Sequence, residues 1–78
     1  MQYKIGQRVR AKKDLVDEDF PGEVYLEKFT KREQGYIAGV VTYEPGGPVH
    51  FLISKPESPV DWFEFKAPEF WRSFDIIH

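Results

Sequence analysis

The sequence predicts a small all-β domain with five strands, a long first loop and a short helical turn before the last strand. Three observations predict this fold. Residues 3–13 alternate between apolar and charged side chains, and residues 35–53 contain two β-branched runs around a proline- and glycine-rich turn. Residues 67–77 begin with a proline-containing turn and end in an apolar run. At 78 residues, the chain is expected to form one domain, 1–78.

The composition limits how this domain can be stabilised and where it works. Because the chain has no cysteine, disulfides, thiolate metal sites and a catalytic thiol are excluded, and the core must come from the aromatic residues, 17% of the chain. The sequence shows no secretory h-region, no bilayer-spanning run and no lipidation motif. We therefore expect a cytoplasmic protein that has no contact with a membrane.

The first strand has one apolar and one cationic face. Ile5, Val9 and Ala11 share one parity, and the other parity carries Lys4, Arg8, Arg10 and Lys12. Residues 1–13 have a net charge of +5, whereas the whole chain has −2. This basic stripe is interpreted either as the solvated outer face of the strand or as a phosphate-binding surface.

Residues 14–34 form the predicted long loop. Phe20-Pro21-Gly22 is a strong turn signal, and the apolar residues around it fit a short strand as well as a helical turn. We expect the apolar residues of this segment to fold back on the core as a flap; they are Phe20, Val24, Tyr25, Leu26 and Phe29. The acidic residues Asp14, Asp17, Glu18 and Asp19 lack the spacing and the glycine of a calcium loop, and no metal site is predicted.

The hairpin 35–53 organises the rest of the chain. Pro45 presets a turn, and Gly46 and Gly47 supply positive φ angles, so the tip is expected to project beyond the sheet. Gly39 predicts a bulge or bend in a central strand. His50, next to the turn, is expected at the surface.

The C-terminal third contains a second turn, two strands and a helical turn. The turn covers 55–59, and in the strand 60–66 Phe63 and Phe65 are expected in the core while Trp62 faces solvent. Pro68 starts a helical turn over 67–71, and the last strand, 73–77, carries Phe74 and Ile76 on one side.

Three stretches resemble SH3-like β-barrels: 5–10 (IGQRVR), 35–41 (GYIAGVV) and 68–77. The small photosystem I subunit and the variable subunit of ferredoxin-thioredoxin reductase have similar opening and closing elements, and this resemblance implies a docking or accessory role. The plasmid-encoded type II dihydrofolate reductases are also similar at 5–9 and 35–41. Their pore segment is Val-Gln-Ile-Tyr, whereas the nearest segment here, 60–63, is Val-Asp-Trp-Phe and lacks the glutamine and the tyrosine.

The inventory of catalytic groups is small, and no enzyme is predicted. No serine lies in a nucleophile-elbow context, no phosphate-cradling glycine loop occurs, and only His50 and His78 are near-neutral bases. Asp61 and Glu64 fall on opposite faces of one strand, so they do not form a facing carboxylate pair.

The leading hypothesis is a protein-protein interaction or accessory module, of the kind found among phage and plasmid accessory or inhibitor proteins, that works without a cofactor as a monomer or homodimer. An SH3-like barrel has a concave surface between its first loop and its middle hairpin, and aromatic anchors with an acidic rim would bind the partner there. The predicted binding residues are Tyr25, Tyr36, Tyr43, Trp62, Trp71, Asp17, Glu18 and Asp19. Whether Trp62 and Trp71 bind a partner or cap the core is open at this point.

The alternative hypothesis is nucleic-acid binding in the manner of Tudor-like or KOW-like barrels. A cationic strand face follows a phosphate backbone, and affinity then falls with salt. The residues predicted for this function are Lys4, Arg8, Arg10, Lys12 and Lys13. The acidic remainder of the chain repels the same polymer, so this hypothesis ranks second.

Overall fold

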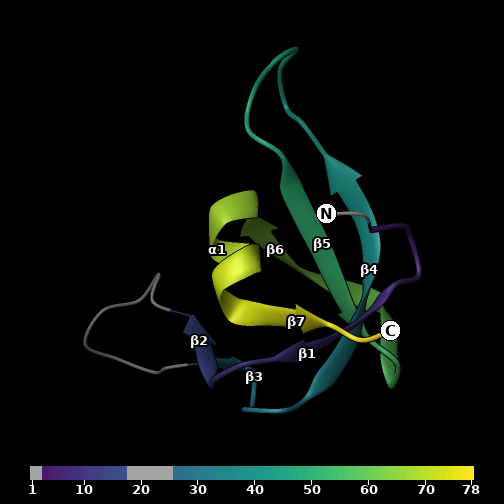
Figure 1. The fold of residues 1–78 in the computed structure, drawn as a ribbon, viewed down its shortest axis with the longest axis vertical. Helices are drawn as coiled ribbons and strands as arrows, with labels where there is room; N and C mark the ends of the chain where they lie inside the picture. The colour runs from purple at the N-terminus through teal and green to yellow at the C-terminus, as the bar shows by residue number, and fades with distance from the viewer. Residues whose placement is uncertain (1–2, 18–25) are drawn as a thin grey trace.

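The structure is a computed structural model that describes residues 3–17 and 26–78. Its elements in chain order are β1 (Arg8–Ala11), β2 (Leu15–Asp17), β3 (Leu26–Phe29), β4 (Gln34–Val41), β5 (His50–Lys55), β6 (Ser58–Lys66), α1 (Ala67–Ser73) and β7 (Phe74–Ile76). Five strands form one antiparallel sheet in the order β6-β5-β4-β1-β7, and β2 pairs with β3 in a second, two-stranded sheet (Figure 1). The all-β prediction is confirmed. Within the described residues no pairing joins β6 to β7, and the closed SH3-like barrel stays a prediction.

The first strand is shorter than expected. Gly6 has a φ of 91°, and the backbone N–H of Gln7 donates to the carbonyl of Lys4 at 2.9 Å, so residues 4–7 form a turn. Ile5 is therefore 61% exposed and does not join the core, which corrects the expected alternation from Ile5 onward. Val9 and Ala11 are buried as predicted.

The long loop contains a hairpin that sequence periodicity did not resolve. β2 and β3 pair antiparallel, with Leu15 opposite Phe29, and both of these side chains are buried. The flap interpretation holds for Phe29. The other apolar residues of the expected flap, or their side chains, lie outside the described part of the chain.

The β4–β5 hairpin has the predicted bulge and turn. The register shifts between Ile37 and Gly39, which leaves Ala38 without an opposite residue, and β4 lies between β5 and β1 at the centre of the sheet. At the tip, the N–H of Gly47 donates to the carbonyl of Glu44 at 2.9 Å, and Gly46 alone of the two glycines has a positive φ, 75°. The tip extends beyond the rest of the sheet (Figure 1).

β6 begins at Ser58, inside the segment expected to be a turn. Pro59 is tolerated there because β6 is the edge strand of the sheet, where a missing N–H costs no central hydrogen bond. The predicted helical turn is longer than expected, Ala67–Ser73, with a proline in its first turn. β7 then pairs with β1.

Phenylalanines dominate the core. The buried hydrophobic residues are Val9, Ala11, Leu15, Phe29, Ile37, Phe51, Ile53, Phe65, Phe70 and Phe74. Phe70 of α1 stacks on Phe51 of β5, with ring centroids 4.3 Å apart, and on Phe74 at 5.4 Å. These contacts fix α1 against the sheet and leave a space between α1, the β2–β3 hairpin and β6.

Candidate functional site

The most exposed apolar side chains of the described strands lie on β6. Val60 is 80% exposed and Trp62 is 60% exposed. The orientation of Trp62 follows from the register, because its neighbour Phe63 lies opposite Ile53 of the core and adjacent residues of a strand point to opposite faces. Val60 lies where the β5–β6 register shifts, and residues 59–62 are all exposed. The prediction that Trp62 faces solvent is confirmed.

A polar cluster lies beside this surface, where the β4–β5 hairpin meets β6. Tyr43, 70% exposed, donates its hydroxyl hydrogen to Oε1 of Glu64 at 2.5 Å, and Nδ1 of His50 lies 2.9 Å from Oε2 of the same carboxylate, without a well-aligned hydrogen bond. The hydrogen bond to Glu64 raises the pKa of Tyr43, because the carboxylate stabilises the protonated phenol. The His50 side chain is only 11% exposed, which corrects its expected surface position.

The remaining predicted aromatic residues have other roles. Trp71 is half-buried and packs on Phe51 and Phe70, with ring centroids 5.4 Å and 4.8 Å away, so this tryptophan covers the core. Tyr36 is half-buried on β4 opposite Ser54. Tyr25 lies outside the described residues, as do Glu18, Asp19 and the side chain of Asp17.

The basic residues do not form one continuous stripe. Arg8 donates a hydrogen bond to Oε1 of Gln34 at 2.9 Å. Nζ of Lys12 lies 3.2 Å from the carbonyl oxygen of Trp71 and 3.7 Å from Oδ1 of Asp75. Lys4 belongs to the turn before β1, and Arg10 is exposed on β1. Within the described residues, Arg8 and Lys12 are therefore partly engaged by the protein's own groups.

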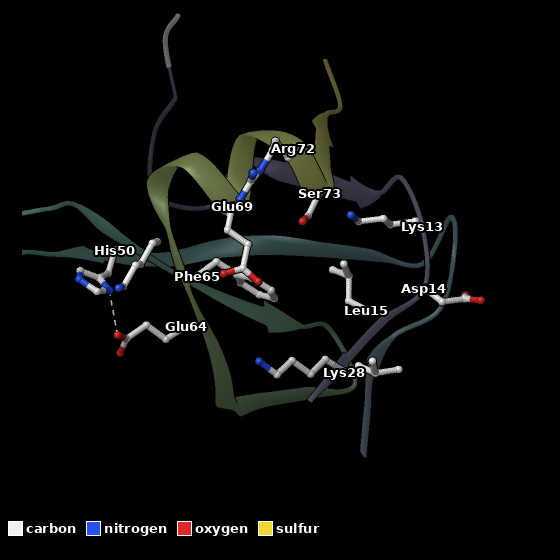
Figure 2. A pocket seen from close by; sticks show the side chains of 12 residues that line it. Lys13, Asp14, Leu15, Lys28, His50, Glu64, Phe65, Glu69, Arg72 and Ser73 are labelled. Atoms are coloured by element: carbon white, nitrogen blue, oxygen red, sulfur yellow. Dashed lines mark ion pairs between the residues drawn. The ribbon is translucent and has the colours of Figure 1, made fainter. Parts of the chain in front are cut away.

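Lys13 belongs to a different feature, a cavity of about 790 Å³ between the β2–β3 hairpin, α1 and β6 (Figure 2). Its lining residues are Lys13, Asp14, Leu15, Val16, Lys28, His50, Glu64, Phe65, Lys66, Glu69, Arg72 and Ser73. None of the predicted aromatic residues lines it. Sequence reasoning missed most of these residues because they come from separate elements, and no local pattern connects them.

No metal-ligand group among the described residues and no known protein assigns a function to the chain. In residues 3–17 and 26–78, no group of three histidine or acidic side chains gathers as metal ligands. The described helix is also too short to span a bilayer. No protein-family model, no curated protein and no solved structure matches the chain.

Proposed function

We propose that the chain is a non-catalytic interaction or accessory module that binds another protein through the outer face of β6. Trp62 is the anchor, and Val60 and Tyr43 extend the contact. The observation that carries this proposal is the 60% exposure of Trp62 on β6, next to Phe63 and Phe65, which pack on the core.

Trp62 is a large side chain with few rotatable bonds. Burying apolar area contributes about 25 cal/mol per Å², so an exposed tryptophan forgoes a large gain that a partner can restore. Tryptophan is also enriched among residues whose truncation costs most of the binding energy at interfaces. A strand backbone fixes its position, which reduces the entropy lost on binding.

The charges around Trp62 indicate the chemistry of the partner. Glu57, Asp61 and Glu64 are exposed on the same strand or the turn before it, against one exposed cation of the strand, Lys66. We therefore expect the partner to present an apolar pocket with basic residues at its rim.

Nucleic-acid binding of the Tudor-like or KOW-like type is the second candidate. It is favoured by the exposed side chains of Lys4, in the turn before β1, and of Arg10, on β1. It ranks lower because Arg8 and Lys12 make internal contacts and because the chain carries a net charge of −2.

The test is affinity capture from the source cells followed by titration of the purified partner. We expect Trp62→Ala to weaken binding at least tenfold, the loss of a typical anchor residue, and Trp62→Phe to retain part of the affinity. The matched control is Ile5→Ala, which removes a side chain of the same exposure, 61%, from the turn before β1. Equal affinity of Trp62→Ala and the wild type, with the fold intact by circular dichroism, would overturn the proposal.

Light scattering across a gel-filtration peak gives an independent check. The proposal expects a monomer or homodimer with no absorbance in excess at 260 nm. A tetramer would instead favour the pore architecture of the type II dihydrofolate reductases, and salt-removable 260 nm absorbance would favour nucleic-acid binding.

A further inference from the structure

We infer that the cavity between α1, the β2–β3 hairpin and β6 is a binding site for a phosphate-type dianion. Trp62 does not line this cavity, but Glu64 lies both there and beside the proposed partner surface, so Trp62→Ala tests the protein partner and Lys13→Gln tests the anion site. About 790 Å³ is a volume typical of small-ligand pockets, which span roughly 300–1,000 Å³.

Cations from separate elements meet at this cavity. Lys13 comes from the β1–β2 connection, Lys28 from β3, Lys66 from the end of β6 and Arg72 from α1. Within the described residues none of the four forms an ion pair. In Figure 2, Lys13 and Lys28 extend from the β2–β3 side toward the middle of the cavity. Several cations around one recess concentrate positive potential there.

The acidic residues at the cavity neutralise only part of this charge. Asp14 accepts a hydrogen bond from the backbone N–H of Lys31 at 2.6 Å, and Glu64 is held by Tyr43 and His50. Glu69 has no such partner among the described residues, and Figure 2 shows its carboxylate reaching into the cavity from α1. Glu69 therefore opposes an anion.

The lining also supplies neutral and apolar groups. Figure 2 shows the Ser73 hydroxyl directed toward the cavity from the end of α1, where it is a further hydrogen-bond donor. The buried side chains of Leu15 and Phe65 form apolar parts of the wall. Nζ of Lys28 lies 5.3 Å from the centroid of the Phe65 ring, so a cation–π attraction holds this ammonium group beside the ring. Phosphate suits such a set because it accepts several charge-assisted hydrogen bonds from lysine and arginine at once.

Titration of the ¹⁵N-labelled protein with inorganic phosphate and with ribose 5-phosphate, at low salt and followed by amide chemical shifts, tests this inference. We expect saturable shifts confined to residues around the cavity, among them Leu15, Lys28 and Ser73. A tighter constant for ribose 5-phosphate identifies a phosphate ester as the source of the anion, and equal constants identify free phosphate. Absence of saturation with both probes, or shifts centred on Arg8 and Arg10 instead, would overturn the inference.

Three variants give the test opposite signs. Lys13→Gln and Lys28→Gln are each expected to weaken binding about three- to fivefold, whereas Glu69→Gln is expected to tighten it by a similar factor. Lys4→Gln, which removes an exposed lysine outside the cavity, is the matched control and is expected to leave the constant unchanged. A structural disturbance would weaken binding in all of the cavity variants, so an unchanged or weaker constant for Glu69→Gln contradicts the electrostatic site.

Discussion

Among the described residues, the most buried and the most exposed aromatic side chains differ in type, and β6 contains one of each. Phe65 is 1% exposed, whereas Trp62 on the same strand is 60% exposed. Within residues 3–17 and 26–78, the fully buried rings are all phenylalanines, the exposed large rings are tyrosines and a tryptophan, and Tyr36, Phe63 and Trp71 are half-buried. The difference shows that the aromatic residues of the chain do not all belong to the core. Rings without a polar atom fill the interior, and rings with an O–H or N–H group stay where water or a partner can satisfy it.

The largest expected effect separates these two groups by stability. Phe29→Ala removes a fully buried ring that packs on Phe63, Phe65 and Phe74, and we expect a loss of about 3–5 kcal/mol in the free energy of unfolding. Trp62→Ala is expected to change it by no more than about 0.5 kcal/mol. Urea denaturation measures both. A comparable loss for the two variants would contradict the division.

A smaller effect concerns the ion pair of Glu33 and Lys55, which lies beside the buried ring of Phe29. Nζ of Lys55 lies 4.8 Å from the centroid of the Phe29 ring and 3.1 Å from Oε2 of Glu33. Burial raises the pKa of Glu33, but the hydrogen bonds from Thr30 and the ion pair with Lys55 outweigh it, and the pKa lies below its ordinary value of 4.5.

Because this pKa is lowered in the folded state, the stabilisation is complete above about pH 4.5 and is lost as the pH falls through the lowered pKa. Glu33→Gln should therefore reduce stability by about 0.5–1 kcal/mol at neutral pH, a value limited by solvent screening, and by progressively less in acid. Urea denaturation at several pH values measures this convergence. Glu57→Gln, at an exposed turn position, is the control and should follow the wild type. Parallel pH curves for Glu33→Gln and wild type would contradict the assignment.

The smallest expected effect is on the pKa of Tyr43, one of the exposed aromatic residues. Since Glu64 raises the pKa of Tyr43, the ultraviolet titration of the phenol is expected to show one tyrosine that ionises above the ordinary pH of 10. Glu64→Gln should return this titration toward the ordinary value, and Tyr43→Phe should remove it. Persistence of the raised pKa in Glu64→Gln would assign it to another tyrosine.

Local sequence signals predicted the features that depend on neighbouring residues. Gly39 indicated the bulge in β4, Pro68 the start of α1, and the alternation of Trp62 with Phe63 the outward direction of the tryptophan. The alternation fails N-terminal to Gly6, because the positive φ of this glycine turns the chain and leaves Ile5 outside the strand.

Features that depend on long-range register were not predictable in this way. The contact of His50 with Glu64 requires the pairing of β5 with β6, including its irregularity between Ile53 and Lys55. The cavity likewise requires the β2–β3 hairpin, α1 and β6 to lie around the same space. Lys28 and Arg72 are distant in sequence, and each alone reads as an ordinary surface cation.

The pairing of β1 with β7 has a consequence for how the protein is made. Val9 lies opposite Ile76, and the side chain of Gln7 donates to the carbonyl of Ile77 at 2.8 Å. During synthesis, β1 leaves the ribosome long before β7 does. The edge of β1 that pairs with β7 therefore stays unpaired until β7 emerges. Contacts of such high sequence separation slow folding. Completion of the sheet is therefore expected after translation of β7, and a nascent chain that lacks this strand offers chaperones or proteases an open edge at β1.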